Sequence, residues 1–266
     1  MELGLAGETC VVLGGTRGVG LETVRLLAEE GANIAVMSRS PEILQPEFDA
    51  LIVRHGVQIA TYAADASMPG EVERAVGAAI GYFGEIHGFV VTNHWMGQAR
   101  GFASISDYEW SQYFENSLMG AVRAMRSVLP HMAGNRSGSV VLTTAYSARA
   151  PKPAIPAYAA FKAALENLVK SLAKTYGPSG IRINAVAPGA LRTGRYDERL
   201  AGLRAAEPDI SVSEAEGRML EQMGMEPALG RIGDPAEVAA LIVFLLSRRA
   251  AYTTGLIANV DGGTDF

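Results

Sequence analysis

The sequence of 266 residues has few of the features that mark disulfide-rich, metal-binding or membrane proteins. Its single cysteine, Cys10, excludes an internal disulfide and fits a reducing compartment. One cysteine and four scattered histidines form no group of metal ligands, so we expect no metal site and no structural zinc. The longest strongly apolar runs, such as Leu241 to Leu246, fall far short of the roughly 20 residues that span a bilayer. We therefore expect no membrane partner.

Charge and the start of the chain exclude two further classes. A formal net charge of −5 gives no electrostatic basis for nucleic acid binding. The first ten residues, MELGLAGETC, lack the basic start and the apolar stretch of a secretory signal. We expect a cytoplasmic protein that has no nucleic acid partner.

Short apolar runs alternate along the chain with longer amphipathic ones. The runs that favour strands are 9–13, 33–38, 57–63, 88–93, 139–144, 181–187 and 256–260. The patterns that favour helices lie near 18–30, 41–54, 69–83, 107–132, 157–176 and 234–247. This alternation predicts an α/β fold with a parallel sheet covered by helices on both faces. Composition does not change along the chain, so we expect a single domain over residues 1–266.

One segment, residues 190–230, is too long and too polar for an ordinary connection. Segments of that length in compact domains are typically lids or binding loops, and the pattern here predicts two short helices. Its methionines at 219, 223 and 225 suit an adaptable apolar pocket. Packing of these methionines between helices is an equally good interpretation.

A glycine-rich loop directly follows the first predicted strand and opens the first predicted helix. In this context Gly14 permits a tight turn, Gly18 lets the backbone approach a pyrophosphate, and Gly20 allows close packing of helix on strand. The helix N-terminus would add amide donors for the phosphates. The alternative is a glycine-rich turn that binds no ligand.

The end of the second predicted strand bears on the choice of dinucleotide. A site for NAD typically places a carboxylate there to bind the ribose diol, and Met37-Ser-Arg-Ser40 contains none. Arg39 and Arg17 instead offer two guanidinium groups where the 2′-phosphate of NADP would lie. These residues therefore predict NADP(H), unless both arginines are only solvated surface side chains.

Tyr158 and Lys162 are four residues apart, which places a phenol and an ammonium on one face of a helix. A free tyrosine titrates near pH 10. A neighbouring lysine and an oxidised nicotinamide would both lower that pKa and favour proton transfer to a carbonyl oxygen. The alternative is that the two residues merely share a helix face.

Together these motifs resemble the short-chain dehydrogenase/reductase family, in particular its 3-oxoacyl-carrier-protein reductase-like members with a YxxxK motif. The resemblance covers nearly the whole chain. Besides the glycine loop and Tyr158-Ala-Ala-Phe-Lys162, its matching pieces are Ala64-Asp65, Asn184-Ala-Val-Ala-Pro-Gly189, Arg231-Ile-Gly-Asp-Pro-Ala-Glu-Val-Ala239 and Thr254-Gly255 with Val260-Asp-Gly-Gly263.

The resemblance implies a single-domain, doubly wound, Rossmann-like fold with a seven-stranded parallel sheet, assembled as a homotetramer or homodimer. It implies an NADP(H)-dependent oxidoreductase, a ketoreductase of small substrates, in which residues 190–230 form the substrate lid. Tyr158 would be the acid/base, and Lys162 would bind the nicotinamide ribose and lower the tyrosine pKa. Asp65 would lie at the adenine and Thr193 near the carboxamide. The full set of expected cofactor-binding residues is Gly14, Thr16, Arg17, Gly18, Val19, Gly20, Arg39, Asp65, Ala66, Asn93, Tyr158, Lys162, Pro188, Gly189 and Thr193.

The chain departs from the family pattern near the fourth predicted strand. Leu13 stands where the glycine motif often begins with Thr, which removes a side-chain hydrogen bond to the strand-four region. After that strand the family's Asn-Ala-Gly reads Asn93-His94-Trp95. The bulky His94 and Trp95 either line the substrate cleft or pack away from it.

The catalytic positions also differ from the family. Ser117 stands where the family supplies an Asn to its proton relay, with Asn116 beside it, and a serine can still hold a relay water. The position of the catalytic serine, thirteen residues before Tyr158, is Ala145. Side chains alternate between the faces of a strand, so Thr143 and Ser147 share the side of Ala145, and Ser147, just past the strand end, lies nearer a substrate. Ser147 is therefore the candidate hydroxyl, and the alternative is a donor from elsewhere, such as His94, Tyr146 or the substrate itself.

The leading interpretation is hydride transfer between NADP(H) and a carbonyl or secondary alcohol carbon. Trp95, Met96, Phe102 and the methionines favour an apolar or aromatic substrate, which His94, Trp95 and Tyr146 would contact. One alternative is a weak or inactive NADP-binding member of the family that acts as a regulator or assembly partner. Another is altered chemistry, such as epimerisation, dehydration or reduction of an activated substrate.

Overall fold

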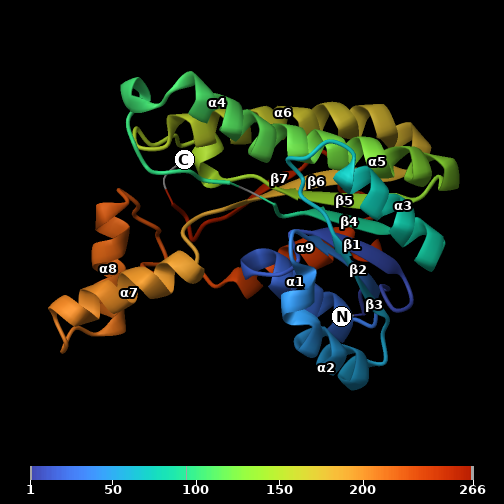
Figure 1. Ribbon diagram of the computed structural model, residues 1–266, viewed down its shortest axis with the longest axis horizontal. Helices are drawn as coiled ribbons and strands as arrows, with labels where there is room; N and C mark the ends of the chain where they lie inside the picture. Colours follow the sequence, from blue (N-terminus) through green and yellow to red (C-terminus); the bar gives the residue numbers. More distant parts are fainter. Residues whose placement is uncertain (1, 94, 265–266) are drawn as a thin grey trace.

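A seven-stranded sheet, parallel throughout, forms the centre of the computed structural model, which describes residues 2–93 and 95–264 (Figure 1). The strand order is β3-β2-β1-β4-β5-β6-β7. The strands are β1 (Thr9–Leu13), β2 (Asn33–Ser38), β3 (Ile59–Ala63), β4 (Gly88–Val91), β5 (Gly138–Thr143), β6 (Ile181–Pro188) and β7 (Ile257–Val260). The predicted parallel sheet and its seven strands are confirmed.

The central strands are apolar on both faces because helices cover both. All five residues of β1 are buried. Val11 and Leu13 belong to one hydrophobic cluster, while Cys10 and Val12 belong to a second on the opposite face. This alternation within a continuous apolar run is typical of a parallel sheet between two helical layers.

The helices form these two layers (Figure 1). One layer holds α3 (Glu71–Phe83), α4 (Asp107–Tyr113), α5 (Gly120–Asn135) and α6 (Pro156–Tyr176). The other holds α1 (Gly18–Glu29), α2 (Gln45–His55) and α9 (Pro235–Leu246). Short 3-10 segments lie between them: η1 (Pro41–Leu44), η2 (Phe102–Ser104), η4 (Tyr146–Ala148), η5 (Gly177–Ser179) and η6 (Arg248–Ala250).

Two predicted helices are interrupted. The pattern over 41–54 begins as the 3-10 segment η1, and the α-helix starts only at Gln45, because Pro46 lacks an N–H and fits the first turn of a helix. The single helix predicted over 107–132 is divided into α4, a π-helical segment η3 (Phe114–Met119) and α5. The π-helical turns carry Ser117, and such irregular turns are frequent at functional sites.

Residues 190–230 form the two short helices that the sequence predicts, α7 (Gly194–Ala206) and α8 (Val212–Gln222). They stand away from the sheet at one end of the molecule (Figure 1). A parallel bridge between Leu191 and Gly233 joins the two ends of this segment. We call residues 190–230 the lid segment.

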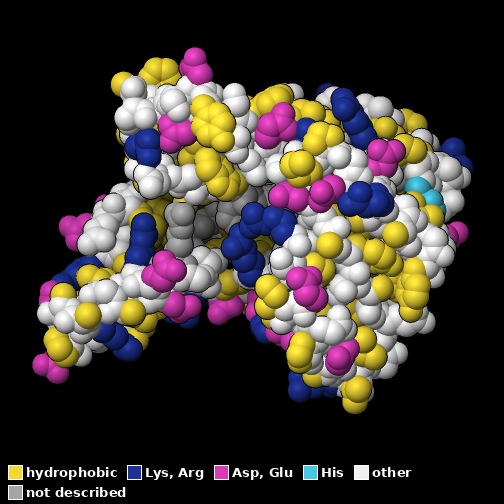
Figure 2. Space-filling view, in the orientation of Figure 1, with side chains coloured by type: hydrophobic (Ala, Val, Ile, Leu, Met, Phe, Trp, Pro, Cys, Tyr) yellow, Lys and Arg dark blue, Asp and Glu magenta, His cyan; other side chains and the backbone are white. Residues whose placement is uncertain are grey.

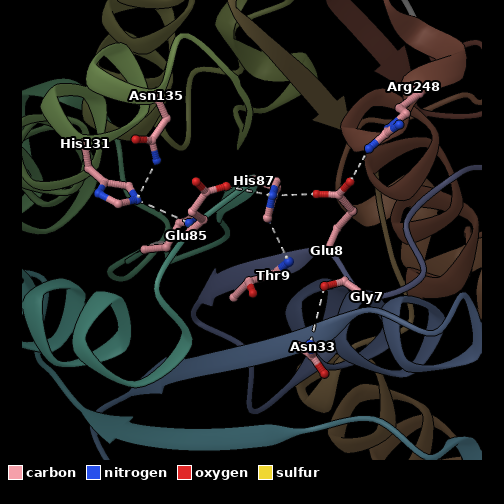
Figure 3. A network of polar contacts seen from close by, with 10 residues as sticks. Gly7, Glu8, Thr9, Asn33, Glu85, His87, His131, Asn135 and Arg248 are labelled. Atoms are coloured by element: carbon pink, nitrogen blue, oxygen red, sulfur yellow. Dashed lines mark hydrogen bonds and ion pairs between the residues drawn. The ribbon is translucent and has the colours of Figure 1, made fainter.

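A polar network ties the amino ends of β1 and β4 together, at the edge of the sheet opposite to the carboxyl ends (Figure 3). His87 Nδ1 accepts a hydrogen bond from the Thr9 amide at 3.1 Å, and its Nε2 lies 2.8 Å from Glu8 Oε2. Glu8 also pairs with Arg248. These contacts join segments that are far apart in the sequence and stabilise the end of the sheet where β1 and β4 begin.

Within residues 2–93 and 95–264, no helix combines the length and the apolar composition that a bilayer crossing requires. No three His, Cys, Asp or Glu side chains of the same residues are grouped so that they could hold a metal ion.

Candidate active site

The loop between β1 and α1 is packed too closely for side chains. A Cβ atom on Gly20 would lie 2.1 Å from the Gly14 carbonyl oxygen and 2.6 Å from Thr92 Oγ1. Gly14 has a φ of +92°, a left-handed conformation that favours glycine. A Cβ on Gly18 would lie 3.7 Å from Thr193 Cγ2, so this loop faces the start of α7. The tight turn at Gly14 and the close packing at Gly20 are therefore as predicted.

Two buried polar atoms lie at the ends of strands that flank this loop. Ser38 Oγ, at the end of β2, and Asn93 Oδ1, just after β4, have no hydrogen-bond partner among the described residues. Leaving such an atom unpaired costs roughly 1–3 kcal/mol. The site lies where the strand order reverses between β1 and β4, at the carboxyl ends of the strands. A polar ligand bound along this edge would satisfy both atoms, so the residues present fit a dinucleotide.

The two arginines predicted for the 2′-phosphate are both exposed. Arg17 precedes α1 and Arg39 follows β2. Neither forms a hydrogen bond or an ion pair within the part of the chain that the structure describes. Figure 2 shows basic side chains on the wall of a hollow between the lid segment and the rest of the molecule. Both guanidinium groups are thus available to an anion.

The other expected cofactor residues line the same edge of the sheet. Asp65 Oδ1 accepts hydrogen bonds from the amide and hydroxyl of Ser67, at 2.9 and 2.7 Å, and shapes the turn after β3. A Cβ on Gly120 would meet both Asn93 Nδ2, at 3.0 Å, and Ala66 Cβ, at 3.1 Å, so Asn93 and Ala66 are neighbours.

Four more of the expected residues frame the edge from other sides. Thr16 is half-buried in the glycine loop, while Val19 packs against the hydrophobic cluster below it. Pro188 ends β6, and the amide of Gly189 donates to the Val260 carbonyl at 3.1 Å. Because its side chain packs into the hydrophobic cluster, Val19 leaves its backbone as the part that a cofactor could contact.

Tyr158 and Lys162 lie at the start of α6, which begins with Pro156. Lys162 is 1% exposed, and its Nζ donates a hydrogen bond to the Thr143 carbonyl at 2.9 Å. The same Nζ lies 5.6 Å from the centre of the Tyr158 ring. Because Thr143 is the last residue of β5, this contact fixes the lysine at the carboxyl edge of the sheet.

Burial decides the protonation of this pair. It lowers the pKa of Lys162 to about 8, because the ammonium has lost its hydration. The pKa of Tyr158 is raised above its ordinary value, first by burial and then by the phenols of Tyr146 and Tyr113. The direction for Tyr158 is opposite to the lowering expected from the sequence. The phenol is therefore neutral near pH 7.

Comparison with known proteins identifies the family of this chain. The family model described as enoyl-(acyl carrier protein) reductase matches residues 14–265. The chain belongs to the short-chain dehydrogenase/reductase family.

Three similar proteins illustrate the range of this family. Oxidoreductase UcpA of Escherichia coli O157:H7 is 33% identical over 98% of this chain and 95% of its own. The structure of L-sorbose reductase from Gluconobacter frateurii, complexed with NADPH and L-sorbose, has a TM-score of 0.89 at 29% identity and covers 99% of this chain and 98% of that one. A short chain oxidoreductase from Pseudomonas aeruginosa PAO1, described as containing an atypical catalytic center, has a TM-score of 0.90 at 30% identity, with 98% of each chain covered.

The hydrogen bond that Leu13 removes from the family's glycine motif is replaced from the opposite side. Thr92 Oγ1 donates to the Leu13 carbonyl at 2.9 Å. The link between β1 and the segment after β4 thus persists, with the donor on the other strand. Sequence reasoning missed Thr92, although a hydroxyl next to Asn93 was a visible signal.

Ala145 stands at the position of the family's serine and has no hydroxyl. The prediction for Ser147 relied on side chains that alternate between the two faces of a strand, but the backbone at Ser147 is not a strand. Strand β5 ends at Thr143, and Ser147 lies in the 3-10 segment η4, where side chains no longer alternate between two faces. Ser147 is fully buried, and its Oγ has no partner in the described part of the chain.

Ser117 is buried in the π-helical segment η3, and its Oγ donates to the Trp95 carbonyl at 3.3 Å. Asn93 Nδ2 donates to the carbonyl of Asn116 at 3.3 Å. These two contacts fasten η3 to the segment after β4. Ser117 therefore joins η3 to the segment after β4, and its relay role stays a prediction.

A cavity of about 470 Å³ lies between the segment after β4 and α4. The residues on its wall are Trp95, Met96, Gly97, Gln98, Arg100, Ile105, Tyr108, Glu109, Gln112 and Tyr113. Trp95 lines it and contacts the ring of Tyr113 edge-on, with ring centres 4.5 Å apart. His94, the other bulky residue singled out in the sequence, is outside the described residues.

Tyr113 is a second site residue that sequence reasoning missed. It is 3% exposed and connects the cavity wall to Tyr158, since its phenol is close enough to raise the pKa of Tyr158. A signal was present, because Tyr113 precedes Ser117 by one helical turn.

The lid segment has a hydrophobic cluster of its own. Met219 and Met225 are buried in it, together with Leu220 and Ile232, and the ring of Tyr146 packs against it. Of the two interpretations of these methionines, packing between helices is the one the structure shows. The buried carboxylate of Glu216 binds Arg192 Nε at 2.9 Å and the Tyr196 hydroxyl at 2.7 Å, which joins α8 to the start of α7.

We predict that burial of Lys162 makes stability depend on pH. The folded-state pKa of about 8 lies below the ordinary 10.5, so between these values the unfolded chain binds more protons. The free energy of unfolding should therefore rise as the pH increases from 8 to 10, and the rise should be absent in Lys162→Met. A shift of this size corresponds to about 3 kcal/mol in total.

Urea unfolding at pH 7, 8, 9 and 10 measures this difference between the wild type and Lys162→Met. Lys170→Met, at an exposed position of the same helix, is the matched control and should follow the wild type. Parallel pH profiles for the wild type and Lys162→Met would contradict the assignment of a buried, destabilised ammonium.

Proposed function

We propose that the protein is an NADP(H)-dependent oxidoreductase that moves a hydride between the nicotinamide and a carbonyl or secondary alcohol carbon. One observation carries this proposal. The buried Lys162 ammonium is held by the Thr143 carbonyl beside Tyr158, at the sheet edge that the glycine loop also faces. A burial that costs free energy in this way is typical of catalytic acid–base pairs.

When bound, the nicotinamide supplies or accepts the hydride. In the direction of reduction, Tyr158 donates its proton to the substrate oxygen, and its raised pKa keeps that proton in place at neutral pH. Lys162, with a pKa of about 8, exchanges protons close to neutral pH. It returns a proton to the Tyr158 phenolate that forms when the phenol has donated its own. A water held near Ser117 would complete the relay.

Three features of the chain support NADP(H) as the cofactor. Arg17, before α1, and Arg39, after β2, are exposed, and Ser38 Oγ at the end of β2 is buried and unpaired. Two guanidinium groups and a hydroxyl are donors that suit a phosphate. The related L-sorbose reductase was solved with NADPH.

The substrate we propose is an apolar or aromatic carbonyl compound. Trp95 and Tyr113 form an aromatic wall of the 470 Å³ cavity, and Tyr113 is also a neighbour of Tyr158. Tyr146 belongs to η4, which contacts α6, and its ring packs against the hydrophobic cluster of the lid segment. Three aromatic rings around one proton donor favour a flat, weakly polar molecule.

The proton-transfer step predicts the effect of removing the phenol. Tyr158→Phe keeps the ring and removes the transferable proton, so NADPH consumption with any accepted ketone should fall by at least 1,000-fold, a loss on the order of general acid catalysis. Stopped-flow and steady-state measurement of NADPH oxidation check this.

NADPH affinity is the control readout, because Tyr158→Phe should bind NADPH within threefold of the wild type by fluorescence titration. A Tyr158→Phe protein that keeps full turnover would refute the role of Tyr158.

Cofactor choice gives a separate prediction. Arg39→Ala removes one charged contact to the 2′-phosphate and should weaken NADPH binding by 10- to 100-fold, in line with about 1.5–3 kcal/mol for a charged hydrogen bond, and leave NADH binding unchanged. Arg54→Ala, which removes an exposed arginine of α2, is the matched control. A wild type that prefers NADH in fluorescence titration would show that Arg17 and Arg39 have another role.

A second candidate function is NADP binding with little or no turnover, in a regulator or an assembly partner. The observation that favours it is Ala145, which lacks the family's hydroxyl. The Pseudomonas aeruginosa relative is nevertheless described as an oxidoreductase with an atypical catalytic center, so a changed centre is compatible with oxidoreductase activity. Tight NADPH binding without turnover of any ketone, quinone or imine would favour this candidate. Turnover of quinones or imines alone would favour altered chemistry on an activated substrate.

We also propose a homodimer or homotetramer. An aromatic row runs over η2, α4, η3 and α6, with Phe102 70% and Phe114 39% exposed. Trp110 and Phe161 join it, with neighbouring ring centres 5.9 Å apart. Such a contiguous apolar face typically marks a protein interface.

Light scattering should give a mass of two or four chains for the wild type and a lower mass for Phe114→Glu. Ile43→Glu, at an exposed position outside the row, is the control. A monomeric wild type at micromolar concentration would contradict the proposal.

A further inference from the structure

The position from which the family's serine would bind a substrate oxygen carries no hydroxyl in this chain, because the residue there is Ala145. Ala145 is extended, with φ −161° and ψ 149°, and only 5% exposed. Its methyl group can make no hydrogen bond to a carbonyl oxygen. Because the negative charge on that oxygen grows during hydride transfer, a second donor beside Tyr158 would stabilise the transition state.

The hydroxyl groups on either side of Ala145 along β5 are engaged elsewhere. Thr143 Oγ1 donates to the Val91 carbonyl at 3.2 Å. Thr144 Oγ1 lies 3.2 Å from both Glu166 Oε1 and the Val186 carbonyl. Ser147 is the exception, because its Oγ has no partner in the described part of the chain, but the residue has no exposed surface, whereas Tyr146 is half-buried.

Tyr146 differs from these neighbours in burial and in bonding. It is half-buried, and its hydroxyl makes no hydrogen bond with another residue of the described chain. Tyr146 belongs to η4, which packs directly against α6, the helix of Tyr158 and Lys162. The phenols of Tyr146 and Tyr158 are close enough for the first to raise the pKa of the second.

We propose that the Tyr146 hydroxyl is the second donor to the substrate oxygen, in place of the serine that Ala145 lacks. The assignment rests on the proposed function, since it concerns the same reduction at the same site. Tyr158 and Tyr146 then approach one carbonyl oxygen, the first from α6 and the second from η4.

The environment of Tyr146 makes it a donor and not an acid. Its pKa is raised, first by burial and then by the Asp261 carboxylate, so the phenol keeps its proton. During reduction the hydride forms the new C–H bond, the Tyr158 O–H bond breaks, and its proton forms the new O–H bond of the alcohol. Tyr146 donates a hydrogen bond throughout and transfers no proton.

The lid segment positions this donor. The ring of Tyr146 packs against the cluster of Met219, Leu220, Met225 and Ile232. A serine at position 145 would be fixed by the sheet alone, whereas the Tyr146 hydroxyl depends on the lid helices for its place. Binding of a substrate under the lid segment is thereby coupled to donation of the Tyr146 hydrogen bond to the substrate oxygen.

The decisive variants are Tyr146→Phe and the double variant Ala145→Ser with Tyr146→Phe. Tyr146→Phe keeps the ring packed in the lid cluster and removes only the hydroxyl. Loss of one oxyanion donor costs roughly 100- to 1,000-fold in kcat in hydrolases, and we expect a fall of about 100-fold here. Restoring a hydroxyl with Ala145→Ser in the same chain should recover at least tenfold. Tyr82→Phe, which removes an exposed phenol of α3, is the matched control and should match the wild type.

Thermal unfolding and NADPH titration accompany each variant, and unchanged values attribute the loss to the substrate oxygen. A Tyr146→Phe protein within threefold of the wild-type kcat overturns the proposal, as does a loss in Ser147→Ala without one in Tyr146→Phe. If Tyr146→Phe lowers kcat and the added Ala145→Ser does not recover it, the Tyr146 hydroxyl acts through packing of the lid segment, and this result also overturns the proposal. Failure of the proposed function is distinct from these results, because it appears as a wild type without turnover or a Tyr158→Phe protein that remains active.

Discussion

The site is organised around one hydrogen bond, from Lys162 Nζ to the carbonyl of Thr143. It places a buried ammonium at the end of β5, and the loss of hydration there lowers the lysine pKa to about 8. The same contact ties the first turns of α6 to the end of β5, and the Tyr158 ring lies 5.6 Å from the lysine Nζ. A buried charge is costly, so the geometry around it must be rigid to keep it. Sheet and helix layers on both sides supply that rigidity.

The carboxyl edge of the sheet also gathers the glycine loop and the polar groups at the ends of β2 and β4. The glycine loop brings backbone amides to this edge, and Thr92 replaces the hydrogen bond that Leu13 removed. Ser38 and Asn93 each present a buried polar atom that no residue of the described chain satisfies. These unsatisfied atoms are consistent with an edge shaped around a polar ligand. The positions that depart from the family pattern, such as Ala145 and Ser117, therefore lie beside an edge whose glycine loop and strand ends follow that pattern.

Much of this arrangement could be predicted from the sequence, and the limits have physical causes. The positions of strands and helices followed from the period of the hydrophobic residues, which is a local pattern. The turn at Gly14 and the close packing at Gly20 followed from the backbone freedom of glycine after a strand. The choice of Ser147 carried the alternation of strand side chains beyond the predicted strand end at residue 144, but β5 ends at Thr143 and η4 changes the side-chain period from two to three. The raised pKa of Tyr158 depends on Tyr113 and Tyr146, which only the folded chain brings together. The division of the helix at Ser117 likewise reflects tertiary contacts with Trp95 and Asn93.

Hydride transfer itself is tested most directly with NADPH that carries deuterium at both C4 positions. Incubation with a panel of apolar and aromatic ketones, followed by mass spectrometry of the products, locates the label. We predict an alcohol with one deuterium on the carbon that was the carbonyl carbon. Binding of the labelled NADPH without a deuterated alcohol from any of the ketones would contradict the central claim.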